Sequence, residues 1–206
     1  MHPLPNYARR IEYLESTGTQ WIDTGVAASG VLRVVADAQY LDLRSTPGLF
    51  GVVTSLRFDL VVNGNNFKWE PGYHNTYTSS TVAADSSRHT FDLSNRFVLD
   101  GISLWVRDVA EFSAENVLIF ALQRIGRIGN FAKARLYSLQ FLLSGVPVRS
   151  FVPCRVGSVG YLWDEVTGAF FGNSGTGNFV LGTDIAGGGY HGLPTPLHPL
   201  GGGLRE

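Results

Sequence analysis

Short runs of β-branched and aromatic residues, divided from one another by glycine, are the feature that most constrains how this chain folds. The segments 31–43 and 134–143 alternate apolar with polar residues at the period of a β-strand, although 134–143 does so imperfectly. The segment 89–106 predicts three consecutive strands, of which the last two are joined at Asp100-Gly101. Asp-Gly is a strong hairpin signal because both turn positions favour positive φ.

The rest of the chain repeats this pattern and contains no convincing helical stripe. Further short strands are expected in SFVPCRV, VGYLWDEV and GAFFG, with Thr167-Gly168 as the turn between the last two. The best helical candidate, 106–117, has room for one short turn. Many short strands at intervals of about 8–12 residues are typical of a β-sandwich or barrel. The length of 206 residues and the 44% hydrophobic content suit one large all-β domain, placed at residues 11–184.

Both ends of the chain differ from this domain in composition. The N-terminal arm, 1–10, and the C-terminal arm, 185–206, are rich in proline and glycine. Proline stiffens the C-terminal arm between the glycine triplets 187–189 and 201–203, so we expect it to press leucines into a neighbouring subunit. The alternative is a floppy terminus or linker. The expected assembly residues are Leu193, Pro194, Leu197, Pro199 and Leu200.

The charge of the chain narrows its choice of partners. A formal net charge of −1 gives no support for nucleic-acid binding, which needs a basic face. Arginine outnumbers lysine by 14 to 2. Arginine stacks on aromatic rings and pairs with carboxylates through two hydrogen bonds, so this bias suits ordered interfaces. The alternative explanation is the compositional habit of a GC-rich genome.

The sequence contains no recognisable signal for export or for membrane insertion. No apolar run approaches the roughly 18 residues that would cross a bilayer. The start of the chain lacks the order of a signal peptide. If the protein acts outside a cell, we expect it to arrive by lysis or in a particle. The single cysteine, Cys154, allows no intrachain disulfide and is expected to be a small buried residue.

Catalytic and cofactor motifs are not evident. The glycine-rich string 172–177 lacks the dinucleotide-binding spacing and is expected to be a loop between strands. Glycan-cleaving sandwiches need two carboxylates flanking one bond. Here Asp164 and Glu165 are adjacent and point to opposite faces, while Glu111 and Glu115 fall in an expected loop. We therefore predict a non-enzyme with no catalytic residue, no metal site and no cofactor.

Two regions have the composition of a binding surface. The segment 62–80 combines aromatic rings with asparagine amides, which suit the apolar faces and hydroxyl rims of sugars. The segment 123–135 gathers four cations around two glycines and suits an acidic polysaccharide or the carboxylates of a subunit. The alternatives are a polar hairpin loop with tryptophan packed inward, and a solvated basic loop. The candidates are Asn66, Trp69, Tyr73, His74, Asn75 and Tyr77 in the first region, and Arg124, Arg127, Lys133 and Arg135 in the second.

Four blocks of sequence resemble one family of β-sandwich domains. They are YLESTGTQWIDTG (13–25), RHTFDLSNRFVLDG (88–101), ARLYSLQF (134–141) and the long segment 148–179 that ends in GNSGTGNF. In this order they are similar to the concanavalin A-like, laminin-G-like jelly-roll domains that are frequent in phages and gut bacteria. The departures are Ser150, where the family usually has Asp, and Trp163, where other residues are common.

The resemblance implies a two-sheet antiparallel jelly roll, and it identifies no catalytic or ligand-binding residue. Some laminin-G-like relatives bind calcium at a sheet rim, but no residue here matches that site. Within the first block we expect two short strands around a turn at Ser16–Thr19, with Tyr13 and Trp21 packed into the sandwich. Asp23 and Thr24 are expected to cap or cross-link backbone.

Together these observations predict a non-catalytic structural or adhesive protein on the surface of a bacteriophage particle. It would be a tail appendage or a capsid decoration, with host-surface glycan as a candidate ligand. We expect a homo-oligomer, or contacts with other virion proteins, through the terminal arms. The first alternative is a bacterial carbohydrate-binding module or lectin, and a remote alternative is a glycan hydrolase.

Overall fold

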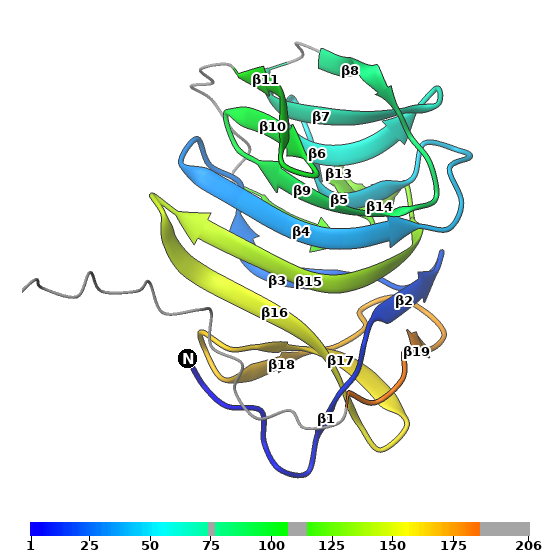
Figure 1. The fold of residues 1–206 in the computed structure, drawn as a ribbon, viewed down its shortest axis with the longest axis vertical. Helices are drawn as coiled ribbons and strands as arrows, with labels where there is room; N and C mark the ends of the chain where they lie inside the picture. The colour runs from blue at the N-terminus through cyan, green and yellow to red at the C-terminus, as the bar shows by residue number, and fades with distance from the viewer. Residues whose placement is uncertain (74–76, 107–114, 186–206) are drawn as a thin grey trace, which may run out of the picture.

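The computed structural model describes residues 1–73, 77–106 and 115–185, and these residues form strands, turns and loops without a helix. Two sheets pack face to face (Figure 1). Sheet I has the order β11-β10-β9-β4-β15-β16-β17-β18, with β1 beside β16, β2 beside β15 and β19 beside β2. Sheet II has the order β14-β13-β5-β6-β7-β8, with β12 beside β5 and β3 beside β12.

The strands of sheet I are β1 (Arg9–Arg10), β2 (Leu14–Thr17), β4 (Leu32–Tyr40), β9 (Arg88–Leu93), β10 (Arg96–Leu99), β11 (Ile102–Val106), β15 (Lys133–Leu143), β16 (Val146–Val156), β17 (Val159–Asp164), β18 (Ala169–Phe171) and β19 (Val180–Leu181). The strands of sheet II are β3 (Ile22–Ala27), β5 (Gly48–Val53), β6 (Leu56–Asn63), β7 (Asn66–Tyr73), β8 (Tyr77–Ala83), β12 (Asn116–Ile119), β13 (Leu122–Arg124) and β14 (Arg127–Gly129). Among these strands the pairing is antiparallel, except that β13 runs parallel to β5. The predicted all-β jelly-roll sandwich is confirmed.

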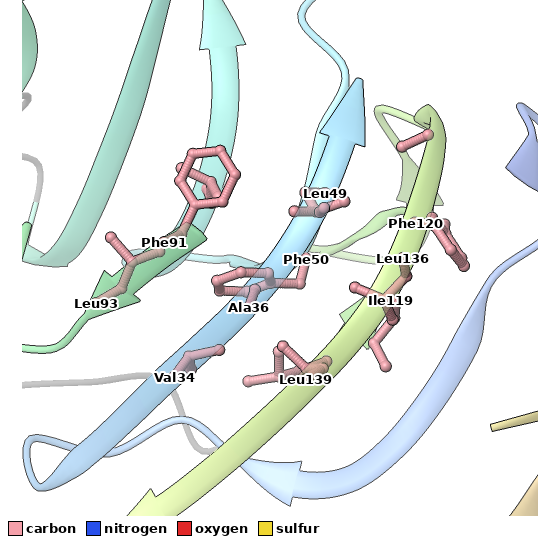
Figure 2. Close-up of a cluster of buried hydrophobic side chains, with 14 of the residues drawn as sticks. Val34, Ala36, Leu49, Phe50, Phe91, Leu93, Ile119, Phe120, Leu136 and Leu139 are labelled. Atoms are coloured by element: carbon pink, nitrogen blue, oxygen red, sulfur yellow. The ribbon is translucent and has the colours of Figure 1, made fainter. Parts of the chain in front are cut away.

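The core fills the space between the two sheets because each strand alternates its side chains between two faces. In β4, Val34 and Ala36 are fully buried while Arg33 is exposed, which confirms the predicted alternation of 31–43. Figure 2 shows how side chains from opposite sheets meet, with Leu139 of β15 and Phe50 of β5 in the same cluster.

The turns that the sequence singled out adopt the expected backbone. Asp100 and Gly101 have φ of 49° and 81° and join β10 to β11. Both residues therefore sit in the left-handed region that a tight hairpin requires. Gly168, with φ of 69°, follows Thr167 between β17 and β18. The helical candidate 106–117 lies mostly outside the described residues, and its last two residues, Asn116 and Val117, begin β12.

The opening motif is built differently from the prediction. Its two strands, β2 and β3, lie in different sheets, so the turn between them is a corner of the sandwich. Tyr13 and Trp21 are half-buried, and the expectation that they pack into the core is wrong. Leu14 and Ile22, one position further along, are the residues that enter the core. The chain alternates at period 2, so this shift places both aromatic rings on outer faces.

Asp23 and Thr24 cross-link backbone as predicted. The carboxylate of Asp23 accepts a hydrogen bond from the Gly25 amide at 2.9 Å. The hydroxyl of Thr24 donates to the Val117 carbonyl at 2.7 Å and so ties β3 to β12.

The N-terminal arm folds back onto the outer face of sheet I. The His2 amide donates to the Glu165 carbonyl at 2.6 Å, and the indole of Trp163 donates to the His2 carbonyl at 3.1 Å. Leu4 packs against a small apolar cluster made of Val152, Cys154 and Trp163. Cys154 is fully buried there, as predicted, and burial raises the pKa of its thiol to about 12. This arm is therefore part of the same folded unit, while residues 186–206 lie outside the described residues.

Candidate functional site

In the predicted sugar-binding segment 62–80, Trp69 is buried and cannot contact a ligand. Trp69 is 1% exposed, and its indole donates to the Ser94 carbonyl at 2.9 Å. Its ring packs edge-on against Phe58 with centroids 4.7 Å apart. A ring in this position is closed to an external ligand. Trp69 is therefore a core residue, and the alternative interpretation in which it packs inward is confirmed.

The described members of that set are spread along β7 and β8. Asn66 begins β7 and Tyr73 ends it, so their backbones are about 23 Å apart at the usual rise of a strand. Asn66 is half-buried, and its amide donates weakly to the Gly64 carbonyl at 3.4 Å. Tyr77 begins β8 opposite Trp69. His74 and Asn75 lie outside the described residues.

The four cations of the second predicted set are divided between the two sheets. Arg124 and Arg127 face each other across β13 and β14 of sheet II, and Arg124 donates to the side chain of Asn130 at 2.6 Å. Lys133 and Arg135 lie on β15 of sheet I. The predicted assembly residues Leu193, Pro194, Leu197, Pro199 and Leu200 lie outside the described residues.

A more ordered surface lies on the outer face of sheet I. Arg88, Gln39, Arg135 and Glu15 are direct neighbours across β9, β4, β15 and β2. Tyr137 joins them because it lies two residues after Arg135 in β15, and residues two apart in a strand share one face. We call this set the tyrosine–arginine surface, and it consists of Tyr13, Glu15, Asp37, Gln39, Arg88, Arg135 and Tyr137.

Each guanidinium of this surface is held by a carboxylate and by a ring. Arg88 forms two hydrogen bonds of 2.7 Å to Asp37, and its Cζ lies 3.7 Å from the Tyr137 ring centroid. Arg135 pairs with Glu15 at 2.7 Å, and its Cζ lies 4.3 Å from the Tyr13 ring centroid.

The two halves of the surface are joined through their tyrosines. The rings of Tyr13 and Tyr137 meet edge to face at 5.7 Å, and the Tyr137 hydroxyl donates to Gln39 at 3.0 Å. The carboxylates raise the pKa of both guanidinium groups, Arg88 and Arg135. Because every one of these side chains has a partner, the surface is ordered before anything binds it. Within the chain, Arg88 therefore both stacks on a ring and forms paired hydrogen bonds to a carboxylate.

A pocket lies where the glycine-rich loop 172–179 meets β17. We call it the glycine-loop pocket; its volume is about 280 Å³. It is lined by Val159, Gly160, Tyr161, Gly172, Asn173, Gly177, Asn178 and Phe179. None of these residues carries a charge. The Tyr161 ring packs edge-on against Phe170 with centroids 5.5 Å apart, which fixes one wall of the pocket.

The loop that forms this pocket is clamped from within. The Asn173 side chain accepts from the amides of Trp21 at 3.2 Å and Gly175 at 2.8 Å, and it donates to the Gly177 carbonyl at 2.8 Å. A Cβ added at Gly175 would lie 2.2 Å from the Thr19 carbonyl oxygen, so only glycine fits there. The string 172–177 is a loop between strands, as predicted, and its glycines allow it to close on the β2–β3 corner.

A buried cluster of four charges lies on the outer side of β6 and β7. Asp59 and Glu70 are direct cross-strand neighbours, 0% and 3% exposed. Arg57 contacts Asp59 at 3.0 Å and Glu70 at 2.8 Å, while Lys68 contacts Glu70 at 2.9 Å. Burial raises the pKa of Asp59 to about 7 against the opposing effect of Arg57. The positive charges of Arg57 and Lys68 compensate the two carboxylates, and the cluster therefore cross-links β6 and β7.

Sequence reasoning missed this pair of carboxylates because it looked along single strands. The signal was present in the near-symmetry of 56–73 about Gly64-Asn65, whose φ values of 55° and 72° mark a tight turn. Pairing outward from that turn places Asp59 opposite Glu70. The two residues are shielded from solvent, so the arrangement does not present an acid and a nucleophile to a substrate.

Comparisons with known proteins leave the chain without an assigned family. No protein-family model matches it, and no curated protein matches it either. The resemblance to laminin-G-like jelly-roll domains therefore stays a prediction. Within the part of the chain that the structure describes, no group of three or more His, Cys, Asp or Glu residues is arranged to hold a metal ion. In the same residues no helix is long and apolar enough to cross a membrane.

Proposed function

We propose that this chain is a non-catalytic adhesive protein of a bacteriophage surface, and that its jelly-roll domain binds bacterial surface polysaccharide. The observation that carries the proposal is the tyrosine–arginine surface. It spans four strands of sheet I, and its guanidinium groups, rings and amide are fixed by one another. The assignment to a phage particle is supported by the sequence resemblance, by a sequence that announces no export signal, and by the leucine-bearing Pro/Gly-rich arms.

The physical reason is preorganisation. Ordering a long side chain on binding costs about 0.5–1.5 kcal/mol, and side chains that are already ordered avoid this cost. Arginine and tyrosine are also, with tryptophan, the residues enriched at the energetic hot spots of protein–protein interfaces. The surface offers donors from Arg88 and Arg135 and acceptors from Asp37 and Glu15 beside the edges of two rings. This mixture fits hydroxyl-rich polymers, which present donors and acceptors along an apolar ring.

A bacterial carbohydrate-binding module is the first alternative, and the same surface favours it. The phage and the bacterial hypotheses propose the same class of ligand, and they differ only in whether the protein belongs to a phage particle or to a bacterium. A hydrolase is opposed by the burial of Asp59 and Glu70. A purely structural role in a particle predicts self-association without any affinity for glycans.

The proposal is tested on the purified full-length chain with an array of bacterial polysaccharides, once with calcium and once with a chelator. We expect saturable binding to a subset of glycans under both conditions. Arg88→Ala removes both the ion pair with Asp37 and the stacking on Tyr137, and it should weaken binding about ten-fold or more. Arg44→Ala is the matched control, because Arg44 is 85% exposed and pairs with Asp42 outside this surface.

Silence of the wild-type protein on the whole array would refute the adhesive role. Equal losses for the Arg88 and Arg44 variants would refute the assignment to this surface. Light scattering on the same sample separates these results from a structural role, because a particle component without glycan affinity should still assemble.

A further inference from the structure

The glycine-loop pocket has the size of a site for one small ring. Its volume of about 280 Å³ is near the lower end of the range of roughly 300–1,000 Å³ that is usual for small-molecule sites. The pocket lies between β17 of sheet I and the loop that leads to β19. A polymer chain does not fit inside this volume, but a terminal or branching unit of a polymer does.

The chemistry of the lining selects an uncharged, hydroxyl-rich ligand. All eight lining residues are neutral, so an ionised ligand would lose its hydration without gaining a counter-charge. Tyr161 supplies an aromatic ring, and Asn178 supplies an amide that both donates and accepts. The Asn178 side chain is exposed and has no hydrogen-bond partner in the described part of the chain, whereas its backbone carbonyl is held by Gln20 at 3.1 Å. The lining therefore combines a fixed backbone with a free amide.

The pocket is also built before a ligand arrives. The side-chain oxygen and nitrogen of Asn173 are both hydrogen-bonded, to Trp21, Gly175 and Gly177, and Gly175 allows the loop to lie directly on Thr19. A loop that is already clamped loses little conformational freedom on binding. The free amide of Asn178 is then a recognition group, because the fold does not use it.

From these observations we infer that the glycine-loop pocket binds a single neutral sugar unit. The unit packs against Tyr161 and is hydrogen-bonded by the side chain of Asn178. This inference rests on the proposed function, since it names the part of a glycan that the adhesive domain recognises. The pocket supplies selectivity for one unit, and the tyrosine–arginine surface contacts the polymer elsewhere.

The test uses the full-length protein and saturation-transfer NMR with glucose, galactose, mannose, N-acetylglucosamine and N-acetylgalactosamine, each at millimolar concentration. At least one of these sugars should bind, and Asn178→Ala should weaken its binding about five- to ten-fold. Asn178→Ala leaves the backbone bond to Gln20 in place, so the fold is retained. Asn95→Ala, at an exposed turn between β9 and β10, is the matched control and should bind as the wild type does.

The outcomes separate this inference from the proposed function. Polysaccharide binding that persists without any monosaccharide binding, or that is unaffected by Asn178→Ala, overturns the pocket and leaves the adhesive role standing. Monosaccharide binding that Asn95→Ala weakens equally also overturns the pocket. If the wild-type protein binds neither polysaccharides nor monosaccharides, both proposals are refuted together.

Discussion

Removal of the N-terminal arm should expose the single cysteine of the chain to thiol reagents. Leu4 packs on the cluster of Val152, Cys154 and Trp163, and the His2 carbonyl accepts the indole hydrogen bond of Trp163. Deleting residues 1–6 removes both contacts but keeps β1, which pairs with β16 next to Cys154. The deletion therefore uncovers the outer side of the cluster and leaves the sheet intact.

The expected magnitude follows from the pKa of the thiol. Burial raises the pKa of Cys154 from an ordinary value near 9 to about 12. The thiolate is the reactive form, and at pH 8 about one thiol in 10,000 is ionised when its pKa is 12, against about one in ten when its pKa is 9. Full loss of the shielding should thus accelerate labelling about 1,000-fold. A smaller acceleration would measure the shielding that the sheet itself provides.

The assay is the labelling rate with a chromogenic disulfide at pH 8, which reports on Cys154 alone because the chain has no other cysteine. Leu4→Asp should accelerate labelling as well, whereas Leu41→Asp, at a leucine that is 37% exposed just after the end of β4, should not. Circular dichroism checks that each variant keeps its β-structure. An unchanged rate in a folded truncated protein would refute the reasoning, because it would show that the arm does not shield the thiol.

Three further predictions concern stability and are measured by urea denaturation. Asp59 has a folded-state pKa of about 7, above its ordinary value, so it favours folding below about pH 4 and this contribution is lost as the pH rises to 7. Asp59→Asn should flatten that decline, and an unchanged pH profile would contradict the assignment. Trp69→Ala should destabilise the fold by about 3–5 kcal/mol, and a loss below about 1 kcal/mol would contradict its place in the core. Gly175→Ala should cost about 1–3 kcal/mol through its clash with Thr19, whereas Gly129→Ala, where a Cβ meets only an ordinary contact, should cost less; equal losses would contradict the clash.

The fold class was predictable because its signals are local. The alternation in 31–43 and the Asp100-Gly101 turn depend on neighbours in the chain, and both appear as expected. The pairing of β2 and β3 with different sheets was not predictable, since two short strands joined by a turn look the same in a hairpin and at a corner. Tyr13 and Trp21 were misplaced for the same reason, because the buried face of each strand depends on which sheet it joins.

The candidate sites were less predictable because they depend on strands that are distant in sequence. Trp69 and the asparagines share a segment, but alternation sends the ring inward and the length of β7 separates the two ends. Arg88, Gln39 and Arg135 come together only through the order β9-β4-β15. Composition therefore revealed which residue types would form interfaces, while their positions required the register of the sheet.

The most direct test of the account is to map glycan contacts by backbone amide NMR. Fragments of the polysaccharides on the array are added to isotope-labelled protein, and changes in amide chemical shift are assigned to residues. We predict changes on the outer positions of β4, β9 and β15 and in the loop 172–179. Absence of any change with every fragment, or changes confined to β13, β14 and the β6–β7 turn, would contradict the account.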